Sequence, residues 1–199
     1  MTRASVVGLL VLAAAACATR KASPPGQIEV RGKEGEIVLT AAPAAGGWDV
    51  TVPGEPALRA VPSPDGAKVT GAGGEVVAEL APGAAGFRMT AAGKTYRVVF
   101  ASPRRVVHVL DDVGVTIMAY EQVANEAMAR DATTRPVAFA RKDGDRVVVT
   151  AGTATLASVA HLPPDRDRHM EALLLAGKEL PPSARAALFA YVHSSNTSR

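Results

Sequence analysis

Four glycines recur along the first half of the chain at a nearly constant spacing, and no other feature restricts the fold as much. Intervals of 19, 20 and 19 residues separate Gly35, Gly54, Gly74 and Gly93. A short segment of alternating apolar and polar residues precedes and follows each of them. Such alternation on both sides of a glycine-containing turn is typical of a β-hairpin, because glycine accepts the positive φ that the turn needs. The spacing therefore predicts four hairpins in tandem.

Prolines follow the first three of these glycines by eight residues, at Pro43, Pro62 and Pro82. Because proline has no N–H to give to a strand ladder, we expect each proline to end the second strand of its hairpin. Two more hairpins are predicted around the turns at 111–114 and 142–145, the second of which contains an Asp-Gly pair. Six hairpins provide about twelve strands, more than an open sheet usually carries without curling or closing.

The remaining segments favour helix. Residues 120–130 lack Gly and Pro and are rich in Ala, Glu and Met, so they predict a short helix, and 155–161 predict one helical turn. Two longer helices are predicted over 165–176 and 183–194, with Gly177 and a Pro-Pro pair between them. Both are apolar around most of their circumference, which favours burial against the sheet over a surface that binds lipid or a partner.

The predicted fold is thus mainly β with C-terminal helices (α+β). A tandem β-hairpin meander closes into a barrel or a strongly curled sheet and packs on one or two apolar C-terminal helices. We expect a signal peptide over 1–17, a polar tether over 18–27, the hairpin region over 28–150, and a helical segment of the same domain over 151–199.

Tandem hairpins with turns such as Gly74-Glu75-Val76-Val77 and Gly93-Lys94-Thr95-Tyr96, followed by an apolar C-terminal helix, resemble the tubby-like superfamily. That superfamily includes the tubby, phospholipid scramblase and LURP-one-related proteins. The resemblance covers residues 28–193 and implies a twelve-stranded barrel wrapped around a hydrophobic helix. This chain departs from the pattern in having two C-terminal helices and no counterpart of the basic phosphoinositide site of tubby. No residue role is carried over.

Residues 1–17 have the layout of a bacterial export signal, in which Arg3 precedes an apolar stretch and small residues lead to Cys17, the only cysteine. Ala14-Ala15-Ala16-Cys17 resembles the lipobox of bacterial lipoproteins, with Ala where Leu is more common three residues before the cysteine. The resemblance implies that Cys17 is lipidated (diacylated, with palmitate among the expected acyl chains) and becomes the new N-terminus. The alternative is an ordinary secretory signal with a chance cysteine.

A lipid-anchored chain belongs to the cell envelope. Ala18, where some bacteria read Asp as a retention signal, favours the outer membrane, with the domain facing the periplasm. Two or more acyl chains on one residue hold a protein stably on a bilayer, and no later segment is long and apolar enough for a span. With Cys17 acylated, no cysteine remains for a disulfide or a thiolate metal site.

The charge pattern argues against nucleic acid as a partner. The formal net charge is +3, aromatic residues make up 4% of the chain, and no run of Lys and Arg exceeds two residues. A nucleic-acid-binding stripe or a polybasic membrane patch needs a denser cluster of positive charge.

The chain contains few candidates for chemistry. The four histidines have no metal-ligand spacing, and no nucleophile elbow or phosphate-binding loop is present, so the sequence predicts no catalytic, metal or cofactor site. His108 with Asp111 or Asp112 is the only candidate pair for proton transfer, against the simpler interpretation of a strand histidine and two turn aspartates. The alternating charges at 165–169 predict a solvated helix face, and Trp48 a core residue.

Three functions remain. The favoured one is a lipid-anchored envelope protein with a non-catalytic β-rich domain that binds a protein or envelope partner. The alternative is a carrier of lipid or another hydrophobic ligand, lined by Leu173, Leu174, Leu188 and Phe189 of the apolar helices. The remote alternative is a hydrolase with a dispersed site that includes His108.

Overall fold

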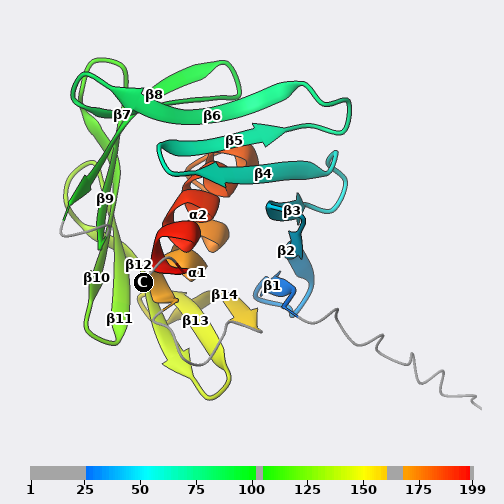
Figure 1. Ribbon diagram of the computed structural model, residues 1–199. Helices are drawn as coiled ribbons and strands as arrows, with labels where there is room; N and C mark the ends of the chain where they lie inside the picture. Colours follow the sequence, from blue (N-terminus) through cyan, green and yellow to red (C-terminus); the bar gives the residue numbers. More distant parts are fainter. Residues whose placement is uncertain (1–25, 102–104, 161–167, 198–199) are drawn as a thin grey trace, which may run out of the picture.

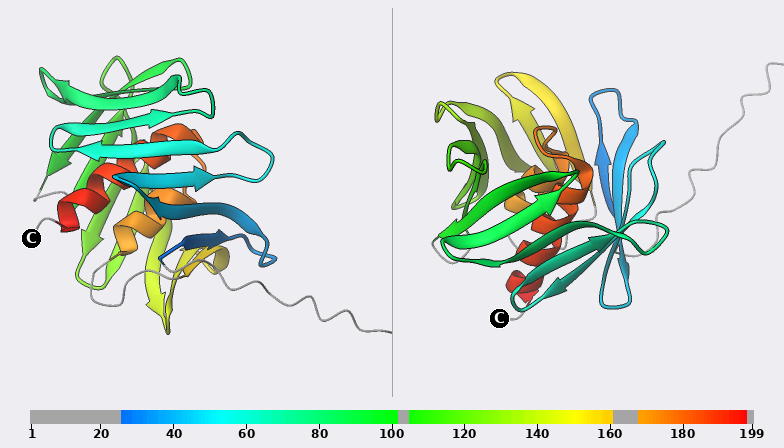
Figure 2. Two further views of the ribbon diagram at one scale, coloured as in Figure 1. Left: turned by 45° about the vertical axis from the view of Figure 1, so that its right-hand side comes forward. Right: turned by 90° about the horizontal axis from the view of Figure 1, so that it is seen from above.

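The chain folds into a closed antiparallel barrel of fourteen strands that surrounds two helices (Figures 1 and 2). The computed structural model describes residues 26–101, 105–160 and 168–197, so the predicted lipid anchor at Cys17 lies outside the described residues. The strands are β1 (Ile28–Arg31), β2 (Ile37–Ala44), β3 (Gly47–Thr51), β4 (Leu58–Ser63), β5 (Gly66–Thr70), β6 (Val76–Gly83), β7 (Gly86–Ala91), β8 (Lys94–Ala101), β9 (Val106–Leu110), β10 (Thr116–Val123), β11 (Glu126–Asp131), β12 (Pro136–Asp143), β13 (Arg146–Ala151) and β14 (Ala154–Ala160). Each strand pairs with its neighbours in sequence, and β1 pairs with β14 to close the ring.

Helices α1 (His169–Ala176) and α2 (Pro182–Thr197) fill the interior. The strands run around both helices in the view from above (Figure 2). α2 packs against β3–β7, whereas α1 packs against β10–β14 and β1. A helix inside a barrel meets apolar wall on all sides, which explains why α2 buries every residue from Ala186 to Val192. The predicted fold class, a hairpin meander closed on apolar C-terminal helices, is confirmed.

The barrel has two ends with different connections. The end where β1 begins, here called the entry end, carries two-residue turns at 45–46, 64–65, 84–85, 124–125 and 144–145. The opposite end, here called the far end, carries the longer turns, for example those at 32–36, 71–75, 111–115 and 131–135, together with two-residue turns at 92–93 and 152–153. α1 begins and α2 finishes at the entry end, so the segment between the two helices lies at the far end.

One hydrogen-bonded turn recurs at the far end. In the turn of β1 and β2, the Gly32 amide donates to Glu36 O (2.8 Å) and the Gly35 amide donates to Gly32 O (3.0 Å). The same pair of bonds recurs in the turns at 71–75, 111–115 and 131–135. The predicted turn glycines 35, 54, 74 and 93 all have positive φ, between +72° and +84°, so the hairpins predicted around them are confirmed.

A second series of glycines lets neighbouring strands approach closely. Gly47, Gly66 and Gly86 are the first residues of β3, β5 and β7. A Cβ atom on them would lie 2.2 Å from Ala60 O, 1.9 Å from Leu80 O and 2.7 Å from Val98 O, respectively. Gly47 is therefore required by the spacing of the wall, whereas Gly66 and Gly86 are required both by that spacing and by their positive φ of +153° and +115°.

The helix predicted over 120–130 is wrong. This segment forms β10, a turn and β11, and burial alternates along it, with Tyr120, Ala127 and Ala129 facing the interior. The helical turn predicted over 155–161 is also wrong, because the part that is described belongs to β14, which closes the barrel. In both segments, pairing and burial in the wall override a favourable helix composition.

Fourteen strands replace the predicted twelve because the segments around 120–130 and 155–160 join the wall. The prolines do not end their strands. β2, β4 and β6 each continue one residue past Pro43, Pro62 and Pro82, which pair with Trp48, Ala67 and Phe87. Residue pairs alternate between bonded and non-bonded in an antiparallel ladder. The pair that flanks a two-residue turn is bonded, so the next pair, which contains the proline, is non-bonded and needs no N–H.

Both predicted long helices are present. The one predicted over 183–194 is α2, which begins one residue earlier and ends three residues later. The one predicted over 165–176 is α1, whose described part begins at His169, while residues 165–167 lie outside the described residues. The Asp-Gly hairpin is confirmed as β12 and β13, although Gly144 and Asp145 form the turn itself.

Candidate functional site

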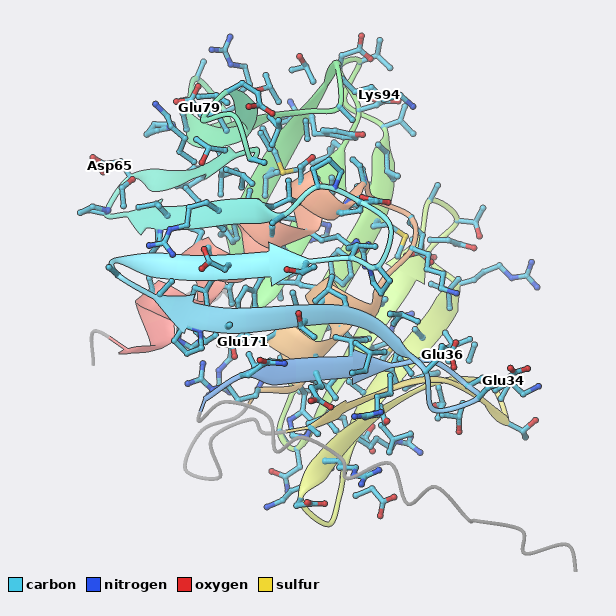
Figure 3. All side chains as sticks on the ribbon, turned by 90° about the vertical axis from the view of Figure 1, so that its right-hand side faces the viewer. Glu34, Glu36, Asp65, Glu79, Lys94 and Glu171 are labelled. Carbon is cyan, nitrogen blue, oxygen red and sulfur yellow. The ribbon has the colours of Figure 1, made fainter. Side chains whose placement is uncertain are left out.

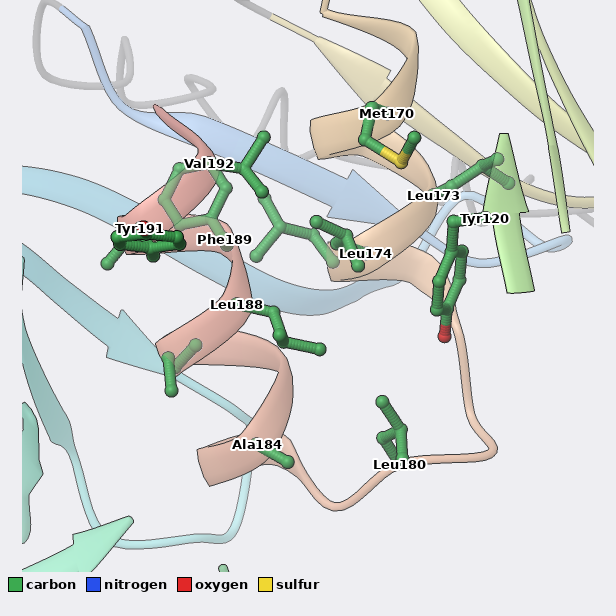
Figure 4. Packing of buried hydrophobic residues seen from close by; sticks show 14 of the residues in the cluster. Tyr120, Met170, Leu173, Leu174, Leu180, Ala184, Leu188, Phe189, Tyr191 and Val192 are labelled. Carbon is green, nitrogen blue, oxygen red and sulfur yellow. The ribbon is translucent and has the colours of Figure 1, made fainter. Parts of the chain in front are cut away.

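The four residues predicted to line a ligand site lie in the core of the barrel. Leu173 and Leu174 of α1 and Leu188 and Phe189 of α2 are at most 2% exposed, and the last three are fully buried (Figure 4). They belong to one hydrophobic cluster that also contains inward side chains of the wall, such as Tyr120. That they contact a ligand stays a prediction.

The chemically richest site is a group of buried charges at the entry end, formed by Arg168, Glu171 and His193. Glu171 is the only charged residue within α1 and is fully buried (Figure 3). Arg168 Nη1 donates to both Glu171 oxygens at 2.7 Å and lies 2.6 Å from His193 Nδ1. Arg168 is 3% exposed, so this ion pair is shielded from water. We call these three residues the entry-end charge cluster.

Arg168 connects Glu171 to His193. A guanidinium has only donors, so its short contact with the His193 ring is made to a nitrogen that can accept a hydrogen bond. Glu171 Oε2 lies 3.6 Å from His193 Nδ1. The cluster links the start of α1 to the last third of α2, and Glu171 in the first turn of α1 also suits the helix dipole.

Trp48 covers the cluster from the wall. Its ring meets His193 edge-on with centroids 4.7 Å apart and Phe189 edge-on at 5.1 Å. Trp48 is 9% exposed, so its predicted place in the core is confirmed. Trp48 therefore packs against the His193 side of the cluster.

A second polar group sits at the far end of the helices. Arg185 Nη1 donates to Leu175 O at 2.6 Å and so satisfies a carbonyl at the end of α1. Burial lowers the pKa of Arg185, and burial also raises the pKa of Tyr120, an effect that the charge of Glu179 reinforces. One arginine therefore binds each end of α1. Arg168 directly precedes its first residue and binds Glu171, and Arg185 of α2 binds the Leu175 carbonyl in its last turn.

The predicted solvated face at 165–169 is wrong where it can be examined, since Arg168 is 3% and His169 is 7% exposed. The sequence feature that indicates burial of Arg168 is Glu171. A lone carboxylate inside the apolar run 170–176 must find a cation when that run is buried, and Arg168 stands three residues before it.

The structure does not bring the proposed proton-transfer pair together. His108 points outward from β9, because its neighbours Val107 and Val109 are fully buried in the core. Asp111 Oδ1 accepts from the Val115 amide of its own turn at 2.7 Å. Within the described residues, no hydrogen bond or ion pair joins His108 to Asp111 or Asp112.

The described residues contain no group of three or more His, Cys, Asp or Glu side chains that could hold a metal ion. Neither helix of the described part is long and apolar enough to cross a membrane. Comparison with known proteins gives no match to a family model, to a curated protein or to a solved structure.

Proposed function

We propose that this chain is a lipid-anchored protein of the bacterial cell envelope whose barrel is a non-catalytic module that binds a partner protein through its outer surface. The anchor is Cys17, and residues 18–27 tether the barrel to the membrane. Because β1 begins at the entry end, the tether reaches the barrel there and the far end points away from the bilayer.

The observation that carries this proposal is a set of exposed aliphatic side chains at the far end. Val113 and Val115 of the turn between β9 and β10 are 80% and 57% exposed, and Val76 at the start of β6 is 52% exposed. Val113 and Val115 are two residues apart in one turn, and such a pair of exposed aliphatic side chains is typical of a contact surface. The Asp111 and Gly114 hydrogen bonds hold that turn in one conformation, so its valines are presented rigidly.

The filled interior supports this proposal over the carrier. The two helices occupy the lumen, and the residues that would line a ligand site are packed against the wall. The buried charges of the entry-end cluster are paired with one another, which is the arrangement of a structural contact between helices.

The anchor is tested by expressing the full chain with Cys17 or with Cys17→Ser and measuring incorporation of labelled palmitate and flotation with membranes. We expect both to be lost in the variant and to be unchanged in Ser23→Ala, a control that alters the tether and keeps the cysteine. Flotation of Cys17→Ser at the level of the parent would contradict the anchor.

Partner binding is tested by a photo-crosslinking amino acid at Val113 in the full chain. We expect an adduct with one other envelope protein, lost when Val115→Asp is added. The control places the crosslinker at Thr90, exposed on the outward face of β7. A bound lipid in solvent extracts of the purified protein, with no protein adduct at Val113, would favour the carrier instead.

A further inference from the structure

The outward faces of two neighbouring strands carry an apolar pair. Met128 on β11 lies directly opposite Phe139 on β12. Both point away from the lumen, because the adjacent residues Ala127, Ala129 and Ala140 are buried in the core. Neither Met128 nor Phe139 is fully buried, so the centre of this face is apolar and accessible.

Charges of opposite sign lie next to this pair, toward the entry end. Glu126 on β11 is opposite Arg141 on β12, with Nε to Oε1 at 2.8 Å, and about half of each side chain is exposed. The Arg141 guanidinium also lies over the Phe139 ring, 5.6 Å from its centroid. In the same row, Val123 of β10 is opposite Glu126 and Val148 of β13 is opposite Arg141. We call these six residues the β10–β13 face.

We propose that the β10–β13 face binds the same face of a second copy of this chain. A two-fold axis parallel to the strands, between β11 and β12, brings each residue opposite its own cross-strand neighbour in the other copy. Glu126 then faces the partner's Arg141, and Met128 faces the partner's Phe139. Val123 faces the partner's Val148. The face is complementary to itself in charge and in apolar surface, and no like charges meet.

The first half of the barrel lacks this combination. Asp49 with Arg59, and Lys68 with Glu79, are also cross-strand ion pairs on outward faces. The outward neighbours of Glu79 on β7, however, are Thr90 and Arg88 rather than large apolar residues. Charge complementarity with an apolar centre thus singles out β11 and β12, since the centre of an interface supplies most of its binding energy.

The direction of this two-fold axis is also compatible with a lipid anchor at Cys17 in both copies, a point that rests on the proposed function. Rotation about an axis parallel to the strands keeps both entry ends on the same side, so both tethers leave the dimer toward one bilayer. An axis perpendicular to the strands within the interface would send the two tethers in opposite directions.

Purified full-length Cys17→Ser protein in sedimentation velocity provides the test, because dimer formation there does not depend on the anchor or on another protein. We expect a dimer whose population rises with protein concentration and a monomer for Phe139→Asp. The matched control, Thr90→Asp on β7, remains a dimer. A parent that stays monomeric at every concentration, or a dimer that Phe139→Asp leaves intact, overturns the proposal.

Charge reversal gives a second test that does not touch the apolar pair. Arg141→Glu places four carboxylates together and weakens the dimer by about tenfold or more, whereas Glu126→Arg combined with Arg141→Glu restores it. Asp49→Arg, which reverses an equivalent pair on β3 and β4, leaves the dimer unchanged. Equal weakening by Arg141→Glu and Asp49→Arg would show that the β10–β13 face is not the interface.

Discussion

Two carboxylates, one in the lumen and one in a turn of the far end, pair with polar groups at very different depths of burial. Glu171 in the lumen is fully buried and depends on Arg168 and His193. Asp131 in the turn between β11 and β12 is exposed and accepts hydrogen bonds from the Thr133 hydroxyl and from backbone amides. When one partner of a buried ion pair is removed, the remaining charge stays buried with neither a counter-charge nor water. An exposed group that loses its partner is rehydrated. The depth of burial, more than the number of hydrogen bonds, therefore decides how much each carboxylate contributes to the free energy of unfolding.

The largest expected effect comes from Glu171→Gln, which leaves the Arg168 guanidinium buried without its counter-charge. We expect a loss of about 3–5 kcal/mol in the free energy of unfolding, measured by urea denaturation. The matched control is Glu126→Gln, which breaks an exposed pair with Arg141 and costs about 1 kcal/mol or less. Replacement of the whole pair, Arg168→Met with Glu171→Leu, should recover most of the loss. Equal losses in Glu171→Gln and Glu126→Gln would contradict the role of depth.

Two glycine substitutions distinguish the cost of a steric clash between strands of the wall from the cost of a strained turn conformation. Gly47→Ala places a Cβ 2.2 Å from the Ala60 carbonyl of the next strand, and we expect a cost of about 2–3 kcal/mol. Gly93→Ala meets nothing within 4 Å but must keep φ near +72°, at a cost of about 1 kcal/mol. Thermal unfolding of the two variants side by side measures the difference. A smaller loss for Gly47→Ala than for Gly93→Ala would show that the wall can relax there.

The sequence predicted Gly93 and missed Gly47 for a physical reason. Turn glycines are flanked by segments of alternating polarity, so their role is visible locally. The glycines at 47, 66 and 86 have the same spacing, but the role of Gly47 depends on a carbonyl in the adjacent strand, which only strand register places there. The hairpins of the first half were predictable because each one is local.

Long-range closure explains the other differences between prediction and structure. Residues 120–130 and 155–160 have compositions that suit a helix, yet they fill the gap in a ring that must close. The importance of the ion pair between Arg168 and Glu171 could not be predicted from their spacing alone, because its strength depends on burial inside a barrel. Apolar helices predicted burial correctly, but nothing in them showed that both lie in the lumen.

The turns at the far end offer a stabilising change. Thr134 occupies the position that Gly35, Gly74 and Gly114 hold in the equivalent turns, and it has a φ of +65°. Thr134→Gly removes the strain of that conformation while the amide still donates to Asp131 O, so we expect a gain of about 0.5–1 kcal/mol. The reverse change, Gly35→Thr, at a site where a Cβ meets nothing within 4 Å, should destabilise by a similar amount. Stability unchanged in both variants would show that these turns tolerate either residue.

The smallest expected effect concerns Asp131 and appears only in acid. The hydrogen bond from the Thr133 hydroxyl, followed by the backbone bonds from Arg135 and Thr133, lowers the pKa of Asp131 from its ordinary value of 3.8. A carboxyl whose pKa is lower in the folded state stabilises the fold above the unfolded value, and this contribution is lost as pH falls through the folded value. Asp131→Asn should therefore make the free energy of unfolding less dependent on pH below 3.8, as measured by urea denaturation at several pH values. Thr133→Val, which removes the hydroxyl donor and keeps the shape, should give part of the same change. An unaltered pH dependence in Asp131→Asn would mean that the surface turn contributes nothing to acid stability, leaving the buried pairs of the lumen to account for all of it.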